Sequence, residues 1–160
     1  MTIQVGDRIP SATLLKATSE GPQPVDTDSY FAGRKVALFS VPGAFTPTCS
    51  VRHLPGYVEK ADELRGKGVD EIACVAVNDA FVMQAWGAQA GADNKVTMLA
   101  DGNGDFAKAL GLTMDASKFG MGLRGSRWSA IVDDGVVAEL NVEEPGAFKV
   151  SSAEFLLGQL

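Results

Sequence analysis

KVALFSVP, residues 35–42, is a short apolar run that Pro42 closes. A similar run, EIACVAV, covers residues 71–77, and both have the length and composition of strands buried on two faces. Between them, apolar residues recur at helical spacing over residues 54–64, ahead of the turn sequence RGKG. This order of strand, helix and strand predicts a right-handed crossover between parallel strands of one sheet.

Further elements follow this unit along the chain. DAFVMQAWGAQAG (79–91) and DFAKALG (105–111) each have the pattern of a helix that ends in glycine, and VTMLAD (96–101) between them that of a strand. MDASKFGMGLRGSRW (114–128) has no clear period and many glycines. It predicts a long loop, and loops of this length tend to be functional.

The two ends of the chain complete the predicted sheet. Two apolar runs surround Asp134-Gly135, which is a strong hairpin signal, and a capping box from Ser151 to Glu154 predicts a closing helix. EGPQP, residues 20–24, predicts the turn of an N-terminal β-hairpin. The sequence therefore predicts an α/β protein with a central mixed sheet flanked by helices.

The composition is that of an ordinary globular protein. The chain has 160 residues, of which 46% are hydrophobic and 21% are charged, and this suits a single domain over residues 1–160. The formal net charge of -6 argues against a nucleic-acid partner, because phosphate contacts need a basic face.

Nothing in the sequence points to a membrane or to secretion. No apolar run is long enough to cross a bilayer, and MTIQVGDRIP has no basic segment followed by an apolar one, as a secretory signal would. Two cysteines do not make a disulfide framework. We therefore expect a cytoplasmic protein with reduced thiols and no membrane partner.

PGAFTPTCS, residues 42–50, contains the first of the two cysteines. Thr46 is a good helix N-cap and Pro47 suits the first helical position, so that Cys49 becomes the third helical residue. Unpaired N–H groups and the positive end of the helix dipole favour an anion there, and therefore the reactive thiolate. The alternative is a small buried cysteine in an ordinary first turn.

Pro42-x-x-x-Thr46-x-x-Cys49 resembles the active-site motif of the peroxiredoxins, and PGAFTPTCS matches it in detail. The resemblance covers essentially the whole chain, and it implies a thioredoxin-like fold. It also implies an antioxidant thiol peroxidase that reduces hydrogen peroxide and alkyl hydroperoxides. Four further stretches are similar to the type II, or peroxiredoxin-five-like, subfamily: FVMQAW (81–86), MLADG (98–102), GSRWSAIVDDG (125–135) and LNVEEPG (140–146).

The resemblance assigns expected roles to individual residues. Cys49 matches the peroxidatic cysteine, whose thiolate attacks the peroxide and becomes sulfenic acid. Thr46 matches the hydroxyl that donates to the peroxide or the thiolate, and Pro42 matches the proline that shields the thiolate from water. Arg127 matches the arginine that the family places beside the thiolate, and Arg124 has at most a supporting role.

His53 lies one helical turn after Cys49, and a cysteine paired with a histidine is also the arrangement of a cysteine protease. The family has no catalytic base there, so we expect a structural polar residue. Two cysteines and one histidine are too few and too scattered for a zinc site, and we expect neither a metal nor another cofactor.

Cys74 alternates with apolar residues on a predicted strand, as a small core residue would. Plant-like members of the subfamily carry a second cysteine at this spacing, and it is a candidate resolving thiol. Other relatives place a resolving cysteine near the C-terminus, where residues 147–155 contain none. We therefore expect Cys49 to be recycled by an external thiol, namely glutathione with glutaredoxin, or else thioredoxin.

A homodimer is expected through the loops around the active site, because AFTP (44–47) and GMGLRG (120–125) carry apolar side chains on predicted surface loops. Two alternative functions remain. One is a non-enzymatic redox sensor that uses Cys49 as a switch. The other is a thiol–disulfide oxidoreductase, which lacks support because the second cysteine of a C-x-x-C motif would fall at Arg52.

Overall fold

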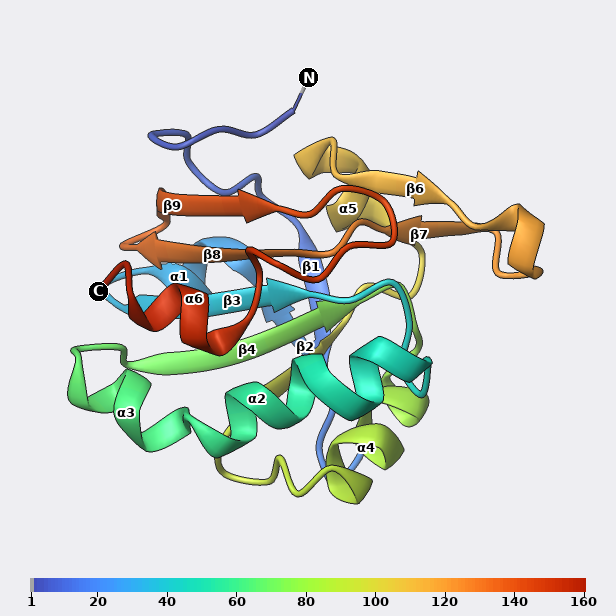
Figure 1. Cartoon of the computed structure of the whole chain (residues 1–160), viewed down its shortest axis with the longest axis horizontal. Helices are drawn as coiled ribbons and strands as arrows, with labels where there is room; N and C mark the ends of the chain where they lie inside the picture. Colours follow the sequence, from blue (N-terminus) through green and yellow to red (C-terminus); the bar gives the residue numbers. More distant parts are fainter. Residues whose placement is uncertain (1) are drawn as a thin grey trace.

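The computed structural model describes residues 2–160, through which one seven-stranded mixed sheet runs in the order β2-β1-β5-β4-β3-β8-β9 (Figure 1). Strands β3, β4 and β5 pair in parallel, and the other pairs are antiparallel. The strands of this sheet are β1 (Thr13–Lys16), β2 (Gln23–Asp26), β3 (Lys35–Ser40), β4 (Glu71–Ala76), β5 (Thr97–Ala100), β8 (Trp128–Asp133) and β9 (Val136–Val142). The predicted mixed sheet and N-terminal hairpin are thereby confirmed.

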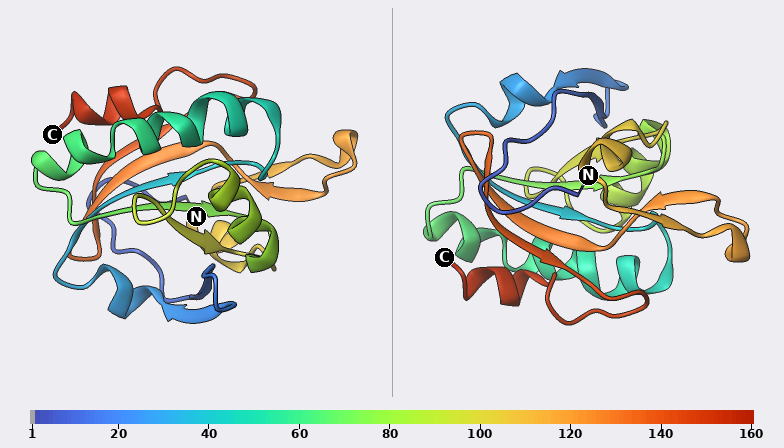
Figure 2. Two further views of the ribbon diagram at one scale, coloured as in Figure 1. Left: turned by 90° about the horizontal axis from the view of Figure 1, so that it is seen from below. Right: turned by 90° about the horizontal axis from the view of Figure 1, so that it is seen from above.

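Helices cover both faces of this sheet. They are α1 (Thr27–Phe31), α2 (Leu54–Glu59), α3 (Ala61–Gly66), α4 (Ala80–Gln89), α5 (Asp105–Leu110) and α6 (Ala153–Leu157), with a π-helical turn η1 (Cys49–His53) and a 3-10 turn η2 (Ser117–Phe119). Figure 2 shows α2 and α6 on one side of the sheet and α1 on the other. No helix among residues 2–160 combines the length and the apolar character that a membrane crossing requires.

The core forms two layers because side chains alternate along a strand. Leu38 and Phe39 are neighbours in β3 and are both fully buried, but they belong to opposite layers. The Phe39 layer includes Leu54, Leu64 and Met83 from the helices α2, α3 and α4. With both faces covered, β3 and β4 need continuous apolar runs, which explains the composition of KVALFS and EIACVA.

The two predicted hairpins form as expected. Asp134 and Gly135 have φ angles of 50° and 80°, which suit the two central positions of a tight turn between β8 and β9. Strand β1 pairs with β2 on one side and with β5 on the other, so the N-terminal hairpin extends the main sheet.

The prediction of a continuous loop over residues 114–128 is wrong. Strands β6 (Thr113–Asp115) and β7 (Leu123–Gly125) pair as a small second sheet, and Figure 1 shows them projecting from the body as an arm. Strands of three residues are too short to show a period in the sequence. Gly120 and Gly122, with φ of 72° and 68°, allow the chain to turn at the tip.

Two predicted helix details are also wrong. The expected helix over residues 54–64 is interrupted at Lys60, which has φ −98° and ψ 10°. The closing helix is capped by Ser152, whose hydroxyl accepts from the Phe155 N–H, and not by Ser151. Ser151 is buried and hydrogen-bonded to Glu143, so its side chain is engaged elsewhere.

The pairing of β3 with β8 brings distant parts of the chain to one end of the sheet. Ser40, the last residue of β3, lies opposite Trp128, the first residue of β8. The Ser40 hydroxyl also donates to the Ser126 carbonyl at 2.8 Å. Arg127, which precedes Trp128, is therefore placed next to the segment that leads from β3 into the helix of Cys49.

Candidate active site

The helix that carries Cys49 begins where the sequence predicts. Residues 47 and 48 are already helical, and the Ser50 N–H donates to the Thr46 carbonyl at 2.9 Å, so Cys49 is the third helical residue. The predicted side-chain cap is wrong, because the Thr46 hydroxyl donates to the Gly43 carbonyl at 2.7 Å. The thiol nevertheless lies in the first turn, where N–H groups lack helical partners.

Arg127 lies directly beside Cys49. Its Nη2 donates to the Cys49 Sγ over 3.1 Å, and its Nη1 lies 2.8 Å from Nδ1 of His53. The side chain of Cys49 is 0% exposed, so water screens this contact only weakly. The guanidinium therefore contacts both the sulfur of Cys49 and the imidazole of His53.

His53 is held in one protonation state by its two partners. Its Nε2 lies 2.9 Å from the Ser151 carbonyl, which only accepts, so Nε2 carries the proton. Arginine only donates, so Nδ1 is the acceptor for Arg127. Burial, and then the charge of Arg127, lower the pKa of His53 from 6.5 to about 3. His53 is thus a neutral acceptor whose free lone pair is engaged by Arg127, and it is not arranged as a base for Cys49.

A cleft of about 460 Å³ opens beside this cluster. Pro42, Thr48 and Arg127 line it on the side of the thiol, and Met114 and Phe119 line it on the side of the β6–β7 arm. Cys49 itself does not reach the surface of the cleft. A molecule in the cleft therefore reaches the sulfur only after a small displacement of these side chains.

Arg124 has a different role from Arg127. Its Nη1 donates to the Val77 carbonyl at 2.8 Å and its Nε donates to the Met121 carbonyl at 2.9 Å. These contacts attach the β6–β7 arm to the chain that follows β4. The structure therefore gives Arg124 contacts to the backbone and not to the thiol.

Cys74 lies in the middle of β4, opposite Phe39 on one side and Met98 on the other. Both cysteines are buried and free, and Cys74 is 0% exposed. Burial, and then the proximity of Cys49, raise the pKa of the Cys74 thiol well above its ordinary value. Cys74 is therefore a core residue that stays protonated at neutral pH.

Three neighbours of the site, Glu143, Phe148 and Ser151, were not predicted as site residues. Glu143 accepts hydrogen bonds from the segment that contains Ser151, and the ring of Phe148 lies 5.0 Å from that of His53. These residues come from the connection between β9 and α6. Their proximity to Cys49 depends on how β8 and β9 pair, which no local pattern reveals.

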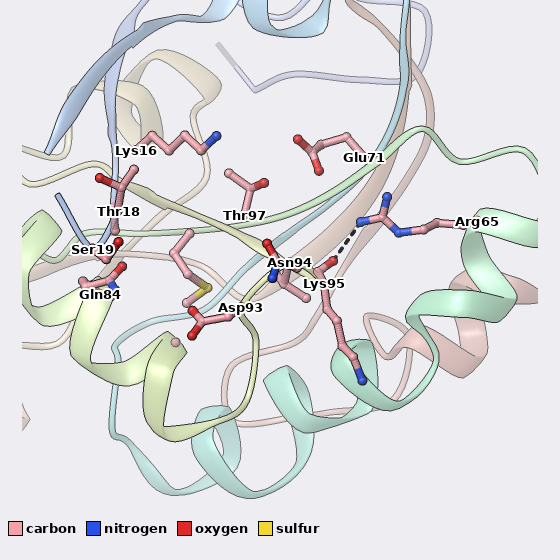
Figure 3. Close-up of a pocket in the computed structure, with 14 residues that line it drawn as sticks. Lys16, Thr18, Ser19, Arg65, Glu71, Gln84, Asp93, Asn94, Lys95 and Thr97 are labelled. Atoms are coloured by element: carbon pink, nitrogen blue, oxygen red, sulfur yellow. Dashed lines mark hydrogen bonds between the residues drawn. The ribbon is translucent and has the colours of Figure 1, made fainter. Parts of the chain in front are cut away.

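A larger cavity, about 560 Å³, lies elsewhere in the molecule (Figure 3). Glu71 and Thr97, which line it, are the first residues of β4 and β5, whereas Cys49 follows the end of their parallel neighbour β3. Arg65 closes one side by donating to the Lys95 carbonyl at 3.1 Å, as the dashed line in Figure 3 shows. No cysteine or histidine lines it, so this cavity does not contain the candidate nucleophile. Within residues 2–160, no group of three His, Cys, Asp or Glu side chains is placed to hold a metal ion.

Comparison with known proteins gives one consistent result. The Redoxin family model matches residues 4–157. Peroxiredoxin-2E from Arabidopsis thaliana chloroplasts is 50% identical over 99% of this chain and 70% of its own length. Peroxiredoxin-2B from the same plant is 47% identical over 99% of this chain and 98% of its own.

A solved structure agrees with these sequence matches. Reduced Prx3 from Vibrio vulnificus, in complex with H2O2, is 54% identical over 99% of both chains, with a TM-score of 0.95. This similarity confirms the thioredoxin-like fold. The chain therefore belongs to the peroxiredoxin family of antioxidant thiol peroxidases.

Proposed function

We propose that Cys49 is the peroxidatic residue of this enzyme. Its sulfur forms a bond to one peroxide oxygen as the O–O bond breaks, and the other oxygen leaves, takes up a proton and departs as water or an alcohol. Cys49 is thereby oxidised by two electrons to sulfenic acid. The observation that carries this assignment is the 3.1 Å contact between Arg127 Nη2 and the Cys49 Sγ.

The displacement develops negative charge on both oxygens, so donors around the peroxide lower the barrier. Arg127 supplies N–H groups beside the sulfur. Thr46 supplies a hydroxyl, which must turn from the Gly43 carbonyl to donate to a bound peroxide. Pro42 lines the cleft, and its proposed role is to keep bulk water from the thiolate.

Hydrogen peroxide and alkyl hydroperoxides are the proposed substrates. The cleft beside Arg127 includes apolar side chains, among them Met114, Phe119 and Pro145, that suit an alkyl group. Its position supports entry of the peroxide from this side. Hydrogen peroxide itself needs none of these contacts.

An external thiol is the proposed reductant. It attacks the Cys49 sulfenic acid and releases water, and a second thiol then resolves the mixed disulfide. Glutathione with glutaredoxin is our first candidate and thioredoxin is the second. The buried, protonated state of Cys74 supports this proposal, because a thiol is a much weaker nucleophile than a thiolate.

The test is peroxide consumption under excess thiol by the wild type and by Cys49→Ser. We expect steady turnover that the substitution abolishes. A protein that reduces disulfides without consuming peroxide would be a thiol–disulfide oxidoreductase. One that is oxidised only stoichiometrically would be a sensor. Parallel assays with glutathione and glutaredoxin, and with thioredoxin, identify the reductant.

We also propose that the protein is a homodimer of the type II, or peroxiredoxin-five-like, group. The names of the plant relatives support the subfamily. Exposed apolar side chains support the interface: Phe45 and Leu123, on the two predicted contact loops, are 48% and 43% exposed. Both loops border the active site.

A further inference from the structure

Glu143 immediately follows β9 and connects two parts of the active site. Its backbone N–H donates to the Arg127 carbonyl at 3.0 Å, which anchors it to the strand end that carries the arginine. Its carboxylate turns the other way. One oxygen, Oε2, accepts from the N–H groups of Lys149 (2.8 Å), Val150 (2.8 Å) and Ser151 (2.9 Å), and from the Ser151 hydroxyl (2.7 Å).

Four donors on one ionised oxygen hold this segment strongly, because hydrogen bonds to a charged group are stronger than hydrogen bonds between neutral groups. Burial alone would raise the pKa of the Glu143 carboxyl, but the donors of Ser151, Lys149 and Val150 outweigh it and lower that pKa. The side chain is only 9% exposed, which limits competition from water. The carboxylate therefore fixes the conformation of residues 149–151.

The fixed segment holds His53. The Ser151 carbonyl accepts from His53 Nε2 at 2.9 Å and from the Tyr57 hydroxyl at 2.9 Å, so both of its lone pairs are used. Phe148 directly precedes this segment, and its ring lies 5.0 Å from that of His53 and 5.8 Å from the Arg127 guanidinium carbon. Phe148 and Ser151 thus contact the imidazole at different positions.

His53 in turn holds Arg127. An imidazole protonated at Nε2 presents a bare Nδ1 to the guanidinium at 2.8 Å, and this leaves Nη2 directed at Cys49. Without the Ser151 carbonyl, the imidazole could place its proton on Nδ1. Two donors would then face each other, and the guanidinium would turn away from the sulfur.

We propose that Glu143 is a positioning residue of the peroxidase reaction. Its carboxylate fixes the backbone of residues 149–151, so that His53 keeps one tautomer and Arg127 keeps its contact with Cys49. The proposal rests on the proposed function of Cys49 and Arg127. It extends that function to a residue that lines the cleft but makes no hydrogen bond to the sulfur.

The test compares Glu143→Gln with Glu154→Gln. Glu154 is exposed in the first turn of α6 and does not line the cleft, so its substitution is a matched control. For Glu143→Gln we expect the rate constant with hydrogen peroxide to fall by about tenfold, because a small misplacement of a catalytic donor has effects of this order. We expect no change for Glu154→Gln.

The second readout is the imidazole tautomer. His53 is the chain's one histidine, so its ¹⁵N signals in NMR need no assignment. We expect the Nε2–H form in the wild type and in Glu154→Gln, and a mixture of tautomers in Glu143→Gln. Loss of rate with an unchanged tautomer would overturn the proposal, and so would a wild-type rate.

Two further variants separate the possible failures. If Glu143→Gln is unfolded by circular dichroism, Glu143→Asp, which keeps the carboxylate on a shorter side chain, takes its place. An intermediate rate with partial loss of the Nε2–H form then supports the positioning role of Glu143, and a normal tautomer with a reduced rate contradicts it. In Cys49→Ser the tautomer is measured without activity. Turnover that persists in Cys49→Ser would refute the proposed role of Cys49. The positioning role of Glu143 would still be tested by the ¹⁵N spectrum of His53.

Discussion

The buried, neutral His53 should make the protein sensitive to mild acid. The perturbation is a change from pH 7 to pH 5. In the unfolded chain the imidazole has a pKa of about 6.5, whereas the folded protein lowers the pKa of His53 to about 3. Between these two values the unfolded state binds a proton that the folded state does not. The free energy of unfolding must therefore fall as the pH falls through this window.

The magnitude follows from the width of the window. Each pH unit below the unfolded value costs about 1.4 kcal/mol, so His53 should contribute a loss of about 2 kcal/mol between pH 7 and pH 5. Hydrogen-bonded carboxyls such as Glu143, whose pKa is lowered, lose their contribution mainly at more acidic pH. Any contribution from other groups is common to the wild type and to a His53 variant.

The assay is urea unfolding at both pH values, followed by the fluorescence of the buried Trp86 and Trp128. His53→Gln is the comparison, because an amide does not titrate. The wild type should lose about 2 kcal/mol more than His53→Gln between pH 7 and pH 5, whatever their absolute stabilities. An equal loss in both proteins would show that the folded state does not keep His53 unprotonated, and would refute this reasoning.

Three further predictions concern the site and its surface. Arg127→Lys should lower kcat/KM for hydrogen peroxide by about 100-fold in stopped-flow assays, because a point charge cannot contact His53 and the sulfur together. The free energy of unfolding should change by less than about 1 kcal/mol. A wild-type rate would remove Arg127 from the site. Cys74→Ser should keep glutathione-dependent turnover within about twofold, although a hydroxyl in the core lowers stability; loss of turnover would make Cys74 a resolving thiol. Sedimentation at high micromolar concentration should give a dimer for the wild type and a monomer for Phe45→Glu with Leu123→Glu, and a monomeric wild type would contradict the proposed interface.

Much of the fold could be predicted because its signals are local. The apolar runs of β3 and β4 are continuous because both faces of the sheet are covered. Asp134 and Gly135 form a turn that needs positive φ at both positions, which those residue types tolerate. The helix that carries Cys49 begins at Pro47, whose fixed φ suits the first helical position, although the Thr46 hydroxyl does not cap it.

Other features could not be read from the sequence because their causes are not local. The turn from Cys49 to His53 is π-helical, so the α-helical spacing assumed from the sequence does not describe how these two side chains lie. The sequence also did not show that Arg127 would contact both of them. The capping box at Ser151 was a false signal, because the Ser151 hydroxyl donates to the carboxylate of Glu143. Contacts across the chain decide both outcomes.

The identity of the nucleophile is the claim on which the mechanism depends. The direct measurement is to oxidise the reduced protein with one equivalent of hydrogen peroxide, without added thiol, and to map the products by mass spectrometry after trapping with a sulfenic-acid reagent. We predict a trapped sulfenic acid on Cys49 and an unmodified Cys74. A trapped label on Cys74 alone, or peroxide consumption by Cys49→Ser at the wild-type rate, would contradict the account.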